Sequence, residues 1–343
     1  MPSSSLTRRR RWPIFLPTLL LLLVAAGWSA FWFIAADRAG TEIDRAIARE
    51  AAAGRRAECG DRRIGGYPFR IEVRCTPARI TLDSRQGPLV FEAPGFVAVA
   101  QLPVPSHLVA EMRSPATLRG AAGGPTISLS FSAAQASVQG SPSTGVDSLS
   151  VELKTPVLER IAGDQVLVGL MANDIAVHTR RAPAGPPGTW DLVARLTGAQ
   201  VPVIESPFAQ APSMVELQLS LIKAELLAPA PTPERLRAFA AAGGKLHLAL
   251  LRAEQGEVLA EAKGDVSLDP QGFLVGDATV TVAGMQQFLA KASEAGLGWI
   301  WTLLPLGRAD KLGERPASTY AVRAAGGAVS VGPLRFGVLP PLF

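Results

Sequence analysis

The chain begins with one long apolar run and continues with segments in which apolar and polar residues alternate. The run covers residues 14–36, and its 23 positions as a helix reach about 34 Å, enough to cross a hydrocarbon core of about 30 Å. It ends among Trp28, Phe31, Trp32 and Phe33, aromatic residues typical of a membrane interface. We therefore predict a retained transmembrane anchor; a cleaved signal peptide, with its shorter apolar core, is the less favoured alternative.

The charges on either side of this run predict its orientation. Arg8 to Arg11 form a basic cluster before the run, and the first acidic residue is Asp37. The positive-inside rule places such a cluster in the cytoplasm. We expect residues 1–13 to be a cytoplasmic tail and the bulk of the chain to lie in the periplasm of a bacterial cell, held to the inner membrane by a single pass.

Residues 37–58 carry a helical pattern. Ile43, Ala46, Ile47 and Ala51 recur at the spacing of one helix face, although Gly54 weakens the helix. We predict a juxtamembrane helix that packs on its own domain; a partner-binding coiled coil would need a longer apolar seam.

The first strand signal and the two cysteines lie close together. Tyr67, Phe69, Ile71, Val73 and Cys75 alternate with polar residues and Pro68, which predicts a strand with one buried face. Cys59 and Cys75 would form a disulfide in an oxidising compartment, joining the end of the helix to this strand. A redox pair is disfavoured because the close Cys-x-x-Cys spacing is absent.

The remaining chain predicts many more strands. Val215, Leu217, Leu219 and Leu221 alternate with polar residues, and comparable segments recur every 10–20 residues between Gly- and Pro-rich turns. The predicted fold is mainly β (α+β), an extended and mostly antiparallel sheet with a few helices near the C-terminus. We divide it into a β-rich region of residues 59–230 and a β-meander with helices in residues 231–343. The boundary near Pro229 could equally be a long connection within one continuous sheet.

One short segment carries a resemblance to a known family. The order of one anchor, an Ala-rich helix, a Cys and then Gly65-Gly66-Tyr67-Pro68-Phe69-Arg70-Ile71-Glu72-Val73-Arg74-Cys75 resembles the uncharacterised bacterial envelope family called domain of unknown function 2125. The Gly-rich turn at residues 264–272 and the terminal Gly332-Pro333-Leu334 are similar in style. The resemblance implies an envelope protein and transfers no catalytic residue.

Charge and candidate chemistry narrow the function classes. The sequence pI is about 9.6, but beyond the four N-terminal Arg the chain has 30 basic against 29 acidic residues, so the basis for nucleic-acid binding disappears. The three His residues lack metal-ligand spacing. Ser220 and Lys223 match Ser-x-x-Lys without the companion motifs of β-lactamase-like enzymes. We therefore expect no catalytic residue, no cofactor and no metal, and a protein that is not an enzyme.

Two functions from different classes remain. An amphipathic sheet at the membrane could bind or transfer a lipid along its apolar faces, with an apolar segment that closes one end or touches the membrane. The candidate contact residues in that segment are Trp299, Ile300, Trp301, Leu303 and Leu304. The alternative is a non-catalytic scaffold that holds other envelope proteins. For either function, the same apolar faces could instead form a dry core.

Overall fold

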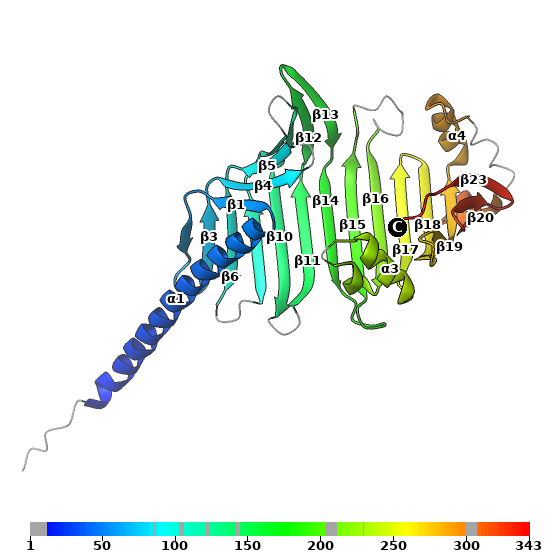
Figure 1. Ribbon diagram of the computed structural model, residues 1–343. Coiled ribbons are helices and arrows are strands. Elements are labelled where there is room, and N and C mark those ends of the chain that lie inside the picture. The colour runs from blue at the N-terminus through cyan, green and yellow to red at the C-terminus, as the bar shows by residue number, and fades with distance from the viewer. Residues whose placement is uncertain are drawn as a thin grey trace, which may run out of the picture.

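The computed structural model describes residues 12–84, 87–102, 106–120, 124–141, 145–202, 211–228, 230–298 and 307–343 (Figure 1). The basic tail of residues 1–11, Pro229 and the predicted contact residues Trp299, Ile300, Trp301, Leu303 and Leu304 lie outside the described residues.

The described chain contains one long helix, a large set of strands and three short helical segments. The helical segments are α1 (Trp12–Ala52), the 3-10 helix η1 (Ala224–Leu227), α3 (Pro233–Ala241) and α4 (Met285–Glu294). The strands are β1 (Arg55–Cys59), β2 (Arg63–Gly65), β3 (Arg70–Cys75), β4 (Ala78–Ser84), β5 (Gly87–Ala93), β6 (Phe96–Gln101), β7 (His107–Met112), β8 (Ala116–Arg119), β9 (Thr126–Ser130), β10 (Ala133–Ser141), β11 (Gly145–Lys154), β12 (Val157–Ala162), β13 (Gln165–Met171), β14 (Asp174–Arg181), β15 (Trp190–Ala199), β16 (Ser213–Ile222), β17 (Lys245–Gln255), β18 (Val258–Leu268), β19 (Leu274–Ala283), β20 (Arg308–Leu312), β21 (Arg315–Ala325), β22 (Ala328–Val331) and β23 (Leu334–Val338).

The anchor and the juxtamembrane segment form a single helix. Helix α1 has 41 residues, and its apolar part is long enough to span a membrane and lies exposed on the molecule. The helix ends at Ala52 rather than at residue 58, because Gly54 adopts a positive φ of 78° and residues 55–59 pair with β4 as strand β1. The anchor therefore continues without a break into the body of the protein.

Two antiparallel sheets make up the body. The larger has 16 strands and runs from β2 to β23, and the smaller has seven strands in the order β1-β4-β5-β8-β9-β12-β13. Figure 1 shows the larger sheet as one broad layer with α1 beside its first strands, and the smaller sheet as a second layer over that end. The expectation of an extended, mostly antiparallel sheet is confirmed.

Seven bends connect the two sheets. A strand of the large sheet continues into the small sheet at residues 76–77, 113–115 and 155–156, and a strand returns at residues 60–62, 94–95, 131–132 and 172–173. Pro77, Pro94, Pro115 and Pro156 occupy four of these bends. Backbone hydrogen bonds continue between neighbouring bends, for example from Thr155 N to Asn173 O at 2.8 Å. Each long strand thus belongs to both sheets without losing its neighbours.

The large sheet is continuous through the segment in which the sequence suggested a domain boundary. Strand β16 pairs directly with β17, so residues 223–244, which include η1 and α3, connect two adjacent strands. Helix α3 begins with Thr232 as its N-cap and Pro233 at N1, and Gly243 follows with a φ of 70°. The meander of β17, β18 and β19 and the helix α4 that follows agree with the predicted C-terminal order.

Little of this fold is a closed core. The accessible surface is 21807 Å², well above the roughly 13,000 Å² expected for a globular chain of 36.0 kDa. One buried cluster, formed by Ala116, Phe131 and Ala134, lies where the two sheets meet, and Phe91 of the small sheet packs on it. The sheets therefore pack on each other along the bends. At the other end of the large sheet, Leu259, Ala283 and Ala317 form a second buried cluster, and Leu289 of α4 is 2% exposed. Strands β14, β16 and β17 between the two clusters contribute no buried residue.

The small side chain of Ala116 at this junction gives a prediction. Ala116 is 2% exposed, so Ala116→Leu should overfill the junction and lower the free energy of unfolding by about 1–3 kcal/mol. The matched control Ala133→Leu changes an exposed residue of β10 and should stay within about 0.5 kcal/mol of the parent. Urea unfolding of the full chain in detergent measures both values, and equal midpoints for the two variants would contradict the packing.

Candidate functional site

The anchor helix holds the first hairpin of the large sheet through its main chain. Trp28 donates its indole N–H to Pro68 O at 2.8 Å, and Trp32 donates to Arg70 O at 2.9 Å. Trp32 is only 6% exposed, although it lies in the apolar part of the helix. Because Trp side chains combine an apolar ring with one donor, they suit this position at a membrane interface.

The segment that carries Tyr67 and Phe69 is a turn and not the first part of a strand. Strand β3 begins at Arg70, and the preceding residues form a turn that Gly66 opens with a φ of 99°. Tyr67 packs edge-on against Trp32 at a ring distance of 5.5 Å, and its hydroxyl lies 2.8 Å from Ser29 Oγ. The side chains expected to face the sheet thus contact the helix, and Tyr67 and Phe69 remain 54% and 69% exposed beside it.

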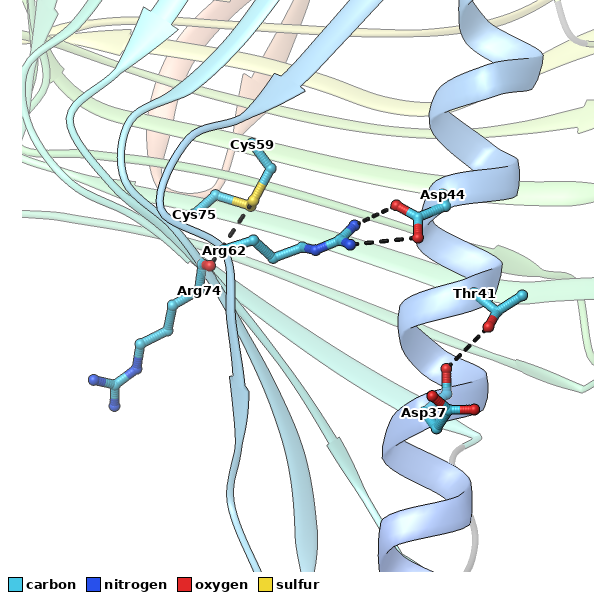
Figure 2. A network of polar contacts seen from close by, with 7 residues as sticks. All are labelled: Asp37, Thr41, Asp44, Cys59, Arg62, Arg74 and Cys75. Atoms are coloured by element: carbon cyan, nitrogen blue, oxygen red, sulfur yellow. Dashed lines mark hydrogen bonds and ion pairs between the residues drawn. A yellow bond between two sulfur atoms is a disulfide. The ribbon is translucent and has the colours of Figure 1, made fainter.

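A second set of contacts joins the helix to the sheet further from the apolar segment (Figure 2). Arg62 donates to Asp44 Oδ1 at 2.6 Å, and this hydrogen bond, followed by the charge of Arg62, lowers the pKa of the Asp44 carboxyl. Cys59 and Cys75 are joined by a disulfide with a Cα–Cα distance of 4.9 Å. The bond links the end of β1 to the end of β3, so it ties the small sheet to the large one and not the helix end to a strand.

An apolar row crosses almost the whole large sheet. The row starts at Ile64 of β2. Each of its residues is paired in register with the residue of the row on the neighbouring strand, and all thirteen side chains are apolar or aromatic. The row consists of Ile64, Val73, Ala98, Ala110, Ala136, Val151, Val177, Ala194, Leu217, Leu251, Ala262, Val280 and Tyr320. Because side chains alternate across a strand, this row defines one face of the sheet, which we call the apolar face.

The opposite face, which we call the polar face, carries charged and hydroxyl side chains. The neighbouring row there runs through Glu152, Ala176, Arg195, Glu216, Arg252, Glu261, Thr281 and Thr319. Its opposite charges pair across strands, as between Arg252 and Glu261 at 3.2 Å. The sheet is therefore amphipathic from β11 to β21.

The centre of the apolar face is not buried by a second layer within the described part of the chain. Strands β11, β14, β16 and β17 contribute no residue to the buried set, and Leu108, Leu149 and Leu251 are 36–41% exposed. The dry-core interpretation holds where the small sheet packs on the face, since Met112 and Leu153 join the buried cluster at the bends. Beyond that junction the apolar side chains of the central strands stay partly exposed, whereas Val282 and Tyr320 at the far end of the face are 7% and 8% exposed.

The polar face carries a hollow that sequence reasoning missed. A cavity of about 570 Å³ gathers Ser148, His178, Arg180, Asp191 and Ser220 from four neighbouring strands. Ser220 donates to Asp191 Oδ1 at 2.7 Å, and Arg180 lies 3.7 Å from the other carboxylate oxygen. The alternation showed that these residues share a face, but only the register, unknown from sequence, brings them together.

Metal ligands were also sought in the described residues. They contain no group of three or more His, Cys, Asp or Glu side chains placed to hold a metal ion.

The fold is that of an antiparallel β-sheet protein in which one N-terminal helix, long and apolar enough to span a membrane, is bonded to the edge of a broad amphipathic sheet. The chain belongs to the bacterial family described as "Uncharacterized protein conserved in bacteria (DUF2125)", which matches residues 32–340. No curated protein and no solved structure matches it. The matched region begins at Trp32, so it includes one of the two helix residues that bind the turn.

The indole hydrogen bonds predict a local effect of a conservative change. Trp32→Phe keeps a ring and removes the donor to Arg70 O, which should weaken the turn by about 0.5–1.5 kcal/mol. Faster amide hydrogen exchange at residues 66–70 of the full chain would report this loss. Trp190→Phe, the same change in β15, should leave exchange in the turn unaltered. Unchanged exchange in Trp32→Phe would show that the indole N–H does not hold the turn.

The Asp44–Arg62 contact predicts a pH dependence. The pKa of Asp44 is lowered from its ordinary value of 3.8 by its hydrogen bond to Arg62, so the contact should persist from pH 7 to pH 5 and be lost only as the pH falls below about 3.8. Asp44→Asn should change the contact at every pH. The guanidinium NMR resonances of Arg62 measure it, and a change in the parent between pH 7 and pH 5 would contradict the ion pair.

Proposed function

We propose that this protein is a non-enzymatic lipid-binding protein of the bacterial inner membrane, with its N-terminus in the cytoplasm and its body in the periplasm. Its apolar face takes up the acyl chains of membrane lipids. The observation that carries the proposal is the apolar row, because thirteen paired positions across the sheet keep one character while the adjacent row on the polar face is charged.

The occupant follows from where the row begins. Ile64 of β2 lies beside the anchor, since a Cβ at Gly40 of α1 would be 3.3 Å from its Cδ1. The turn next to β2 is bonded to Trp28 and Trp32 in the apolar part of the helix. The apolar face therefore starts at the bilayer, and the apolar ligand nearest to it is the acyl chain of a membrane lipid.

Side-chain size along the face supports a linear ligand. Strands β16 and β17 present Leu217, Leu219 and Leu248, whereas β18 presents Ala260, Ala262 and Gly264. On the next strand, β19, Gly276 and Ala278 continue the small residues. The side chains of β18 and β19 are thus smaller than the leucines beside them, and this strip of small residues is where we place a linear acyl chain.

Binding is favoured over catalysis by the chemistry of the polar hollow. The one serine there with a carboxylate partner, Ser220, donates directly to Asp191. Arg180 Nε lies 3.7 Å from the other carboxylate oxygen of Asp191, so both oxygens already have a polar partner. Neither group is suited to activating a nucleophile.

Lipid retention tests the proposal. The full chain, extracted in a mild neutral detergent and measured by native mass spectrometry, should retain phospholipid. Leu251→Gln on the apolar face should lower retention about fivefold, the loss expected for roughly half of a leucine contact. Leu250→Gln, the neighbouring residue on the polar face, is the matched control and should retain lipid like the parent.

Two results would overturn the proposal. One is a folded parent that carries no phospholipid, which would favour the scaffold function. The other is equal retention by Leu251→Gln and Leu250→Gln, which would place the lipid elsewhere. Ala262→Phe, which fills the strip of small residues, should reduce retention as well and provides an independent check.

A further inference from the structure

We propose that the hollow formed by β2 and β3 on the polar face binds the phosphate of an anionic phospholipid headgroup at the surface of the membrane. The cavity measures about 390 Å³ and is lined by Arg63, Ile64, Gly65, Gly66, Arg70, Glu72 and Arg74. It lies on the face opposite to the acyl-binding row, so the proposal does not rest on the lipid-binding function above.

The charges of this hollow are arranged around one buried carboxylate. The Glu72 side chain is 8% exposed and bonds to Arg74, and Arg70 lies 3.3 Å from it. Arg74 uses its Nε for that bond and Arg70 one terminal nitrogen, which leaves each guanidinium further N–H donors. The third cation, Arg63, is 76% exposed and pairs with Asp61 at the surface, an exposed contact that a stronger anion can replace.

The anchor fixes the depth of this hollow relative to the bilayer. Arg70 O accepts the indole N–H of Trp32, and Trp32 lies four residues before the end of the apolar run at Ala36, about 6 Å along the helix. Phe69, directly before Arg70, is 69% exposed, as expected for a residue that meets lipid. The Arg70 side chain is thus at the level of the headgroups, and Arg63 and Arg74 lie further from the membrane.

The ligand class follows from the donor chemistry. Guanidinium groups bind phosphate through paired N–H donors, and arginines next to a bilayer are attracted to anionic lipids. At Gly65 no atom lies within 4 Å of where a Cβ would be, so the main chain of β2 is open beside these donors. A phosphodiester in a headgroup fits this site, and its acyl chains would remain in the adjacent leaflet.

The test measures which lipids the full chain retains from nanodiscs that contain equal amounts of phosphatidylglycerol and phosphatidylcholine. Arg63→Gln with Arg74→Gln leaves Arg70 to pair with Glu72 and should lower the retained phosphatidylglycerol by at least about fivefold, with phosphatidylcholine unchanged. Glu72→Gln removes the competing negative charge and should raise the amount of retained phosphatidylglycerol. Arg323→Gln, a change at an exposed arginine paired with Asp277 in the distant part of the sheet, should retain both lipids like the parent.

Each remaining outcome decides against the proposal. Equal phosphatidylglycerol retention in the double variant and in Arg323→Gln would overturn it, as would the displacement of the lipid by millimolar inorganic phosphate, which would make free phosphate the ligand. If the double variant fails to fold, Glu72→Gln decides alone, and a decrease or no change there overturns the site. Leu251→Gln on the apolar face should lower the retention of both lipids equally. The acyl-chain proposal and the headgroup proposal can therefore fail independently.

Discussion

Two indole N–H groups on the anchor helix hold the main chain of the first hairpin, and the position of the whole sheet relative to the membrane depends on this contact. The acceptors are the carbonyl oxygens of residues 68 and 70, so the contact requires a particular backbone shape more than particular side chains in the turn. Gly66, with its positive φ, supplies that shape. Both bonds lie next to the apolar part of the helix, where water competes weakly for donors and acceptors. The hydrogen-bond ladder then positions each later strand of the large sheet relative to β3, and so relative to this contact.

The alternation of apolar and polar residues predicted the sheet correctly but not what covers each side chain. Tyr67 and Phe69 have the same parity as Ile71, and a strand was therefore expected from residue 67. In the structure these two residues contact the helix, since a period of two shows which residues share a side and not which element lies there. The end of α1 shows the same limit. The residues after Ala52 still have a composition typical of a helix, but residues 55–59 form strand β1 because they pair with β4.

The division into two sheets was not predicted, although the sequence carries a signal for it. Thr76-Pro77, Ser114-Pro115 and Thr155-Pro156 each follow an alternating segment, 38 and 41 residues apart, and each marks a bend from the large sheet into the small one. Proline interrupts the ladder because it has no N–H. The dipeptide is not sufficient alone, since Thr232-Pro233 begins helix α3. The regular spacing of the dipeptides and the alternating segment before each of them distinguish a bend from the start of a helix. The strand register that places the bends side by side exists only in the folded sheet.

The stability of a one-layered sheet and the exposure of its apolar face have one physical origin. Each central strand has hydrogen-bonded neighbours on both sides, and its cross-strand pairs, such as Leu219 with Leu192 and Leu248, stabilise the layer without a second one. An apolar surface of this width on a free protein would favour self-association. The edge strand β2 has only three residues and lies against α1, which protects that edge from pairing with another chain. Lipid from an adjacent bilayer would remove the same apolar surface from water, so a helix that anchors the sheet in a membrane would also bring its exposed face to the ligand proposed for it.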